Sequence, residues 1–178
     1  MSKVGVYPGT FDPPTVAHVA IAETALQQGG LDRVVLVVSE SPLGKKDAGV
    51  AALDARVRLL DAIANTRPWL SVTVNEGGLI SDIAAGYDAV ILGADKWQQV
   101  TDPAWYGGSV LARDAAVARL PRVILAPRHG FIPDTLPAGA LVLDLPSDHG
   151  VVSSTGVRDG NLEWLAEDAL DIWTPPMP

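Results

Sequence analysis

Two segments of the sequence combine hydroxyl groups with a basic side chain at an expected helix start, a combination that suits phosphate binding. The first is VYPGTFDPPTVAH, residues 6–18, in which Thr15 follows two prolines and His18 stands three positions later. A helix that is capped by Thr15 places both side chains on one face of its first turn. The positive end of the helix attracts anions, and Gly9 allows the backbone to approach a phosphate closely. This segment is a candidate anion site.

A second segment, VVSSTGVRDG at residues 151–160, has the same chemical character. Its hydroxyl groups come directly before a short expected helix, and Arg158 follows one turn later on the same face. Taken alone, the first segment could be a proline turn before a surface histidine. The second could be a serine-capped helix with a solvated arginine. Because the combination occurs twice, we favour phosphate binding. The hydroxyl residues of the second segment are Ser153, Ser154 and Thr155.

Neither segment has the glycine pattern of the most common nucleotide-binding loops. The sequence contains no G-x-x-x-x-G-K-[ST] and no G-x-G-x-x-G. Binding through a P-loop and dinucleotide binding of the Rossmann type are therefore not supported.

Short apolar runs alternate with helical patterns along the chain and must position these residues. Such runs predict buried parallel strands with helices on both faces. We expect one domain over residues 1–178, with a Rossmann-like, doubly wound α/β fold in three layers and a frayed tail at 172–178. The expected strands are 3–7, 32–39, 69–74, 87–95, 122–127 and 140–145, and the expected helices are 16–28, 52–65, 109–120 and 162–169.

In such a fold, ligands bind beyond the carboxyl ends of the strands. The loop after the first strand, the loop with GADKW and the loop with SSTGVR would meet there. The turn-rich stretch 96–108 is predicted to be irregular. Apolar spacing predicts that the helix at 52–65 buries one face, made of Leu53, Val57, Leu60 and Ile63 or Ala64.

Composition limits the classes of partner. The 178 residues are 48% hydrophobic and carry a net charge of −8, which argues against broad binding to nucleic acid. There is no cysteine, so disulfides and thiolate metal sites are impossible. No apolar run approaches the roughly 20 residues that cross a bilayer, and no N-terminal secretion signal is evident. We expect a cytoplasmic protein that does not bind membranes.

Together, YPGTFDPPTVAH and VSSTGVR resemble the (T/H)-x-G-H and ISSTxxR signatures of the nucleotidyltransferase superfamily. The resemblance spans nearly the whole chain and implies the nucleotidyltransferase fold. It also implies an enzyme in which a phosphate of the acceptor attacks the α-phosphate of ATP or CTP and pyrophosphate leaves. Mg²⁺, bound mainly by the triphosphate and not by protein ligands, is the cofactor that this reaction implies.

The resemblance assigns roles to individual residues. His18 would bind the nucleotide phosphates and stabilise the transition state, and Thr15 takes the first position of the motif. Ala17 stands where the motif has glycine, which raises the question of catalytic efficiency. The loop that cradles the nucleotide and acceptor phosphates would comprise Gly9, Thr10 and Phe11, and the triphosphate site would comprise Ser153, Ser154, Thr155 and Arg158.

The middle of the chain bears on the acceptor. ILGADKWQQVTDPAW resembles the nicotinate or nicotinamide mononucleotide adenylyltransferases of NAD biosynthesis. That resemblance implies that Asp95 contacts the nucleotide ribose and that Trp105, or alternatively Trp97, lies against a pyridine ring. It also places Lys45 or Lys46 near the acceptor phosphate. A structural tryptophan cluster and a solvated lysine pair are the alternatives for these residues.

Other activities stay open. The opening YPGTFDPPT resembles pantetheine-phosphate adenylyltransferases, and a cytidylyltransferase that acts on a small phosphorylated alcohol is a further alternative. An ATP-binding sensor that has lost catalysis is another, because Thr15 and Ala17 depart from the commonest motif. We favour adenylyl transfer from ATP to nicotinate mononucleotide. The sequence leaves a homo-oligomer open.

Overall fold

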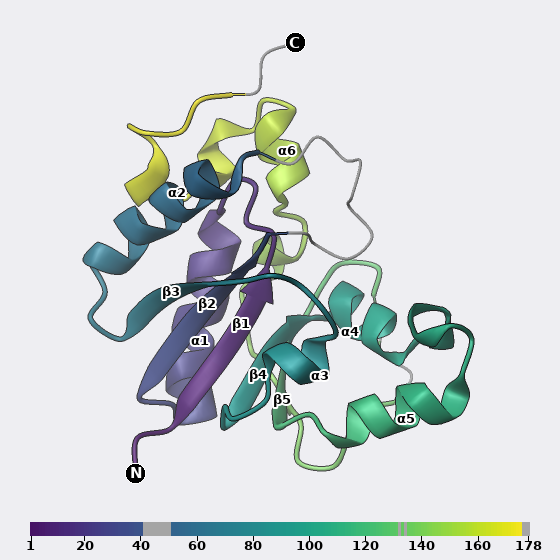
Figure 1. Ribbon diagram of the computed structural model, residues 1–178. Coiled ribbons are helices and arrows are strands. Elements are labelled where there is room, and N and C mark those ends of the chain that lie inside the picture. Colours follow the sequence, from purple (N-terminus) through teal and green to yellow (C-terminus); the bar gives the residue numbers. More distant parts are fainter. Residues whose placement is uncertain (41–50, 132, 134, 176–178) are drawn as a thin grey trace.

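Six parallel strands form one sheet in the order β3-β2-β1-β4-β5-β6 (Figure 1). The computed structural model describes residues 1–40, 51–131, 133 and 135–175. The four central strands β2, β1, β4 and β5 are mostly buried between helices on the two faces, and the edge strands β3 and β6 are partly exposed. This arrangement confirms the doubly wound α/β prediction. The strands are β1 Val4–Gly9, β2 Arg33–Ser39, β3 Leu70–Asn75, β4 Ala89–Gly93, β5 Arg122–Ala126 and β6 Leu141–Val142.

Helices cover both faces of the sheet. On one face α1 and α2 pack on Tyr7 and Ile91, and on the other α3, α4 and α5 pack on Val6 and Leu92. Alternate residues of β1 and β4 thus enter different cores, as the pleat of a strand requires. The α-helices are α1 Val16–Gly29, α2 Leu53–Asn65, α3 Ile80–Ile83, α4 Ala94–Thr101, α5 Val110–Ala118 and α6 Ser154–Arg158; the 3₁₀ turns are η1 Pro103–Tyr106, η2 Ser147–Gly150, η3 Leu162–Trp164 and η4 Glu167–Ala169.

The order of the strands reverses at β1. From β1 the chain runs outward through β2 to β3. It then crosses back to β4, which pairs with the other side of β1, and runs outward through β5 to β6. A crevice forms beyond the carboxyl ends of the strands at such a point. The loops after β1 and β4 are therefore the ones placed to bind a ligand.

Several segments differ from the sequence prediction. The strand predicted over 140–145 is reduced to Leu141–Val142, and the short helix α3 was not predicted. The stretch 96–108, predicted to be irregular, lies mostly in α4 and η1. The helix predicted over 162–169 is two 3₁₀ turns, because Leu165 between them is extended and bridges to Thr15, and the Ala166 N–H donates to Pro14 O. Tertiary contacts with the loop after β1 have overridden the local preference for helix.

The C-terminal segment is held against α2. Arg67 Nη1 lies 2.8 Å from Asp168 Oδ2, and the Thr66 hydroxyl donates to Asp168 Oδ1 at 3.0 Å. Burial alone would raise the pKa of Asp168, but these hydrogen bonds and the charge of Arg67 outweigh it and lower the pKa. Trp173 lies within the tail that was expected to fray. Its backbone N–H donates to Ala169 O, and its side chain packs against the core.

We expect Asp168→Asn to reduce stability in a pH-dependent way. A carboxyl whose pKa is lowered by folding stabilises the protein above its unfolded pKa, and this stabilisation disappears as the pH falls through the folded pKa. Urea unfolding should show a loss of about 1 kcal/mol at about pH 7 and a clearly smaller loss at about pH 3. Asp171→Asn, at an exposed position nearby, is the control. An equal loss at both pH values would contradict the prediction.

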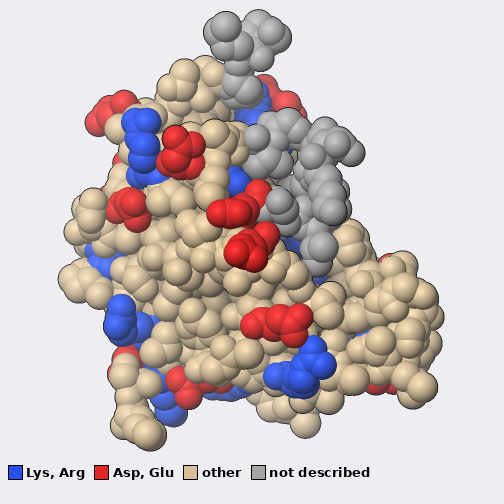
Figure 2. All heavy atoms as spheres, viewed as in Figure 1, with Lys and Arg blue, Asp and Glu red and all other residues tan. Residues whose placement is uncertain are grey.

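The surface carries both signs of charge. Figure 2 shows acidic and basic side chains interspersed over the face in view, within a net charge of −8 for the whole chain. Among the described residues, no helix combines the length and apolar character that crossing a membrane requires.

Candidate active site

Thr15 and His18 form a reciprocal cap at the start of α1. The Thr15 hydroxyl accepts from the His18 backbone N–H at 3.3 Å, and His18 Nδ1 accepts from the Thr15 backbone N–H at 2.9 Å. A neutral imidazole whose Nδ1 accepts carries its proton on Nε2. The predicted helix start is confirmed, and the cap fixes both the orientation of the ring and which nitrogen can donate.

The loop after β1 turns sharply over the ring of His18. Phe11 has a φ of 50° and is 1% exposed, and its ring meets the rings of His18 and Tyr7 edge-on, with centroids 5.0 and 5.5 Å away. A Cβ on Gly9 would lie 2.7 Å from the Phe11 ring. Gly9 is thus required by the packing of Phe11, and Phe11 supports His18 from within the core.

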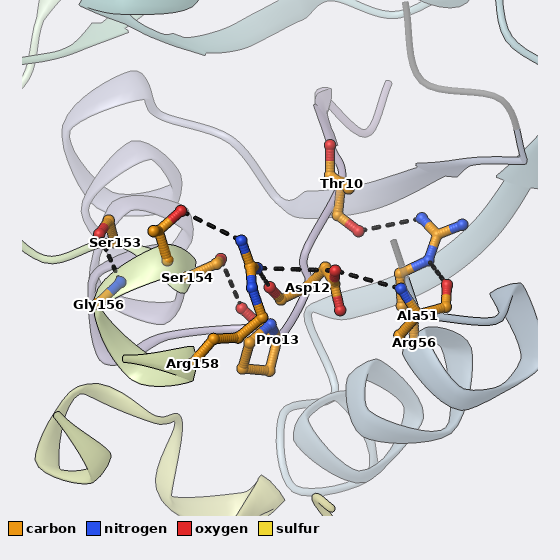
Figure 3. Close-up of polar contacts among 10 residues, drawn as sticks. Thr10, Asp12, Pro13, Ala51, Arg56, Ser153, Ser154, Gly156 and Arg158 are labelled. Carbon is orange, nitrogen blue, oxygen red and sulfur yellow. Dashed lines mark hydrogen bonds and ion pairs between the residues drawn. The ribbon is translucent and has the colours of Figure 1, made fainter. Parts of the chain in front are cut away.

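The second motif docks directly on this loop (Figure 3). The Ser154 hydroxyl donates to Pro13 O at 2.7 Å, and the Arg158 guanidinium donates to Asp12 O. The same guanidinium lies 3.6 Å from the Asp12 carboxylate and donates to the Thr155 hydroxyl at 3.2 Å. Residues 146 positions apart in the sequence are therefore joined, and one cation lies beside the start of α1.

Ser153 has a different local task. It is the N-cap of α6, and its hydroxyl accepts from the Gly156 N–H at 3.0 Å. Gly156 itself packs beneath the Trp164 ring, where a Cβ would collide with the indole. The serines thus shape the motif, while Thr155 and Arg158 are more exposed.

Ala17, which replaces the glycine of the motif, is 2% exposed. Its methyl group packs inside the fold and does not project from the start of α1. The fold therefore accommodates the methyl group of Ala17.

Arg56 is a buried component of the site that sequence reasoning missed. Its side chain is 2% exposed, and it donates to Thr10 O and Ser39 O at 3.1 Å and to Ala51 O at 3.0 Å (Figure 3). Burial lowers the pKa of this guanidinium, and the charge of Asp12 opposes the shift. Arg56 thus ties together the carboxyl ends of β1 and β2.

The face that α2 buries accordingly differs from the prediction. The buried residues are Arg56, Leu59, Leu60 and Ile63, and Val57 is only partly buried. The predicted stripe was right at Leu60 and Ile63. It was wrong at Val57, because the helix turns Arg56 toward the strand ends.

A cleft with Trp105 and Tyr106 on one wall, here called the aromatic cleft, opens from the same loop. Gly9 and Thr10 line one part of it, and Trp105, which is 37% exposed, lines another. Trp97, by contrast, is 3% exposed and donates its indole N–H to Thr135 O at 3.0 Å, so it belongs to the core. Lys45 and Lys46 lie outside the described residues.

Asp95 stands in the first turn of α4, directly beyond β4. Its carboxylate lies against Gly93, where a Cβ would approach Oδ1 to 2.5 Å. Burial and then the negative charge of Asp95 raise the pKa of Tyr7, and Arg128 opposes the shift. Asp95 is therefore close to the end of β1, where the order of the strands reverses.

The chain is similar in sequence to proteins that are named as probable nicotinate-nucleotide adenylyltransferases. The chain is 32% identical to the probable nicotinate-nucleotide adenylyltransferase of Bordetella avium, over 89% of this chain and 85% of that protein. It is 39% identical over 74 residues to the probable nicotinate-nucleotide adenylyltransferase of Listeria welshimeri. This match covers 42% of the present chain and 39% of the length of the Listeria protein.

A solved structure has the same architecture. Plasmodium falciparum nicotinic acid mononucleotide adenylyltransferase, complexed with APC, superimposes with a TM-score of 0.72 at 14% identity. The match covers 96% of this chain and 94% of that one, and it shows the fold. The sequence pattern of the cytidylyltransferase-like family matches residues 6–159, which include the segments YPGTFDPPTVAH and VSSTGVR. The protein belongs to the cytidylyltransferase-like family.

Proposed function

We propose that this protein transfers AMP from ATP to the phosphate of nicotinate mononucleotide in the cytoplasm and releases pyrophosphate. One observation carries the proposal: the capped His18 and the cation of Arg158 meet at the loop after β1, and the aromatic cleft opens from that loop. The names of the relatives support the choice of acceptor. The reaction is a step of NAD biosynthesis.

The reaction needs positioning and charge stabilisation more than a protein nucleophile. An oxygen of the acceptor phosphate forms a bond to the α-phosphorus, and the bond from that phosphorus to the pyrophosphate oxygen breaks. His18 Nε2–H would donate to a phosphate oxygen as negative charge grows in the transition state. Thr15 positions the ring, and the segment from Ser153 to Arg158 binds the triphosphate, with Arg158 as its cation.

The remaining predicted residues are assigned to the two substrates. Trp105 would lie against the pyridine ring, and Asp95 would accept from a ribose hydroxyl of the nucleotide. Thr10 stands where the cleft meets the motif, so it would contact the acceptor phosphate. Either Lys45 or Lys46 is proposed to neutralise that phosphate. We retain Trp105 over Trp97 because only Trp105 lines the cleft.

Mg²⁺ would be held chiefly by the triphosphate oxygens. Within the described part of the chain, no group of three or more His, Asp or Glu side chains could hold a metal ion. Mg²⁺ usually keeps several of its waters and binds nucleotides through phosphate oxygens. When bound, it would neutralise the charge of the leaving pyrophosphate.

Release of pyrophosphate tests the proposal directly. Purified protein with ATP and Mg²⁺ should form pyrophosphate when nicotinate mononucleotide is added. Replacing nicotinate mononucleotide with phosphopantetheine tests for pantetheine-phosphate adenylyltransferase activity. Replacing ATP with CTP tests for cytidylyltransferase activity. Binding of ATP without pyrophosphate from any acceptor would refute the enzyme and favour an ATP sensor.

Trp105→Ala should weaken binding of the pyridine substrate selectively. Loss of one stacked indole should raise the KM for nicotinate mononucleotide about tenfold. Steady-state kinetics with each substrate varied in turn provide the measurement, and Trp105→Phe, which keeps a flat ring, should recover most of the affinity. A rise of the same size in the KM for ATP would reject the role of Trp105 at the acceptor.

A further inference from the structure

Asp12 places a negative charge in the loop that the proposed function assigns to phosphates. The residue is 8% exposed and stands between the phosphate-binding loop after β1 and the start of α1. A carboxylate repels a triphosphate, and burial weakens the screening of that repulsion by water. A buried acid at this place therefore needs a physical reason.

Asp12 holds the guanidinium of Arg158 through two groups. Its backbone carbonyl accepts from Arg158 Nη1, and its carboxylate Oδ2 lies 3.6 Å from the same nitrogen. The other terminal nitrogen, Nη2, donates to the Thr155 hydroxyl at 3.2 Å. The guanidinium is a rigid plane, so partners at two of its nitrogens give it a defined orientation before any ligand binds.

The Asp12 carboxylate is itself anchored to another part of the fold. Oδ2 accepts from the backbone N–H of Ala51 at 3.2 Å, just before α2 begins. Figure 3 shows Asp12 between Arg158 on one side and Ala51 on the other. Because the carboxylate is enclosed and bonded on the side away from Arg158, its position is fixed by the fold. It can therefore determine where the guanidinium lies.

We propose that Asp12 is a positioning residue, which holds the Arg158 guanidinium in the orientation that binds the triphosphate. The inference rests on the part of the proposed function that assigns Arg158 to the triphosphate. A side chain that is already ordered loses less conformational freedom when it binds a phosphate, so binding is tighter. Positioning and repulsion predict opposite changes in affinity when the charge of Asp12 is removed.

The experiment measures the Kd for ATP with Mg²⁺ by titration calorimetry, without an acceptor. Asp12→Asn keeps the size of the side chain and an oxygen for the Ala51 N–H, but it removes the charge. We expect the Kd to rise roughly tenfold. Relief of repulsion alone would lower it. In steady-state kinetics the KM for ATP should rise as well, while the KM for nicotinate mononucleotide stays within about twofold.

Two further variants control for charge and for shape. Asp159→Asn removes the same charge beside Arg158 in the sequence, at an exposed position, and should leave the Kd within about twofold. Asp12→Ser keeps a hydroxyl that can accept from the Ala51 N–H and has no amide NH₂ to meet the guanidinium. It should raise the Kd as Asp12→Asn does. Melting curves without ATP show whether each variant is folded.

A double-mutant cycle tests whether Asp12 acts through Arg158. Arg158→Met alone should raise the Kd for ATP roughly 10- to 100-fold, the cost of losing a charged phosphate contact. In the Arg158→Met protein, Asp12→Asn should change the Kd by less than about twofold, because the group that it positions is gone. A rise as large as in the parent protein would come from Ala51 or from the fold, and it would overturn the inference.

The remaining outcomes separate the inference from the proposed function. An unchanged or lower Kd in both Asp12 variants overturns the inference, and the proposed function stands if the parent protein forms pyrophosphate. A parent protein that binds ATP but forms no pyrophosphate with any acceptor refutes the proposed function, while the cycle still decides the inference. A parent protein that binds no ATP refutes both.

Discussion

Replacing His18 with alanine should lower kcat by about 10²- to 10³-fold, the usual cost of losing one preorganised transition-state donor. The cap at the start of α1 aims Nε2–H by holding Nδ1 as an acceptor from the Thr15 N–H, 2.9 Å away. Alanine removes the donor entirely. Single-turnover measurement of pyrophosphate formation after rapid quenching isolates the chemical step from product release.

The same substitution also removes a helix cap, so a second variant is needed. His18→Ala should cost about 1 kcal/mol of unfolding free energy, since the Thr15 N–H loses its partner. Glutamine three residues after a Thr cap can accept from that N–H. His18→Gln should therefore regain stability without regaining the imidazole, and its turnover should stay low. Turnover that recovers together with stability would show that His18 only caps the helix.

Much of this site could be predicted from local sequence. Thr15 and His18 are three residues apart after two prolines, so the cap and the shared face follow from helix geometry alone. The short serine-capped helix with Arg158 is equally local. The contact between the two motifs could not be predicted from local sequence. The hydrogen bond from Ser154 to Pro13 O joins distant segments and exists only after the sheet has formed.

The structure around the cleft was harder to predict. Residues 96–108 were expected to be irregular because Asp102, Pro103 and two glycines dominate the pattern. A two-turn helix nevertheless precedes them, and its buried residues Ala94, Trp97 and Val100 recur every third position. That spacing was the available signal, although eight residues are too few to distinguish it clearly from a turn.

Arg56 gave no signal in the sequence. An arginine between apolar residues of an amphipathic helix is normally solvated, and only the meeting of two strand ends turns this one inward. Its forked guanidinium reaches carbonyls on both strand ends, Thr10 O and Ser39 O, at 3.1 Å. A side chain that connects loops distant in sequence becomes apparent only in the folded structure.

Arg56→Met should be the most destabilising substitution near the site. It leaves three backbone carbonyls without their charged donor, a loss of about 3 to 5 kcal/mol for breaking a buried charged network. Urea unfolding measures this loss. Arg58→Met, two residues further along α2 at an exposed position, is the matched control and should change stability by less than about 0.5 kcal/mol.

Arg56→Lys separates the structural role of Arg56 from its effect on the substrates. Lysine keeps the charge but has a single nitrogen, so it cannot donate to Ala51 O as Nε does while also reaching Thr10 O and Ser39 O as Nη1 does. Thr10 and its loop should therefore shift while the protein remains folded. We expect an intermediate loss of stability and a rise in the KM for ATP of about tenfold, because positioning by this loop is sensitive to small displacements. Parent-like affinity for ATP in a folded Arg56→Lys protein would mean that the loop keeps its shape without the fork, and that Arg56 serves stability alone.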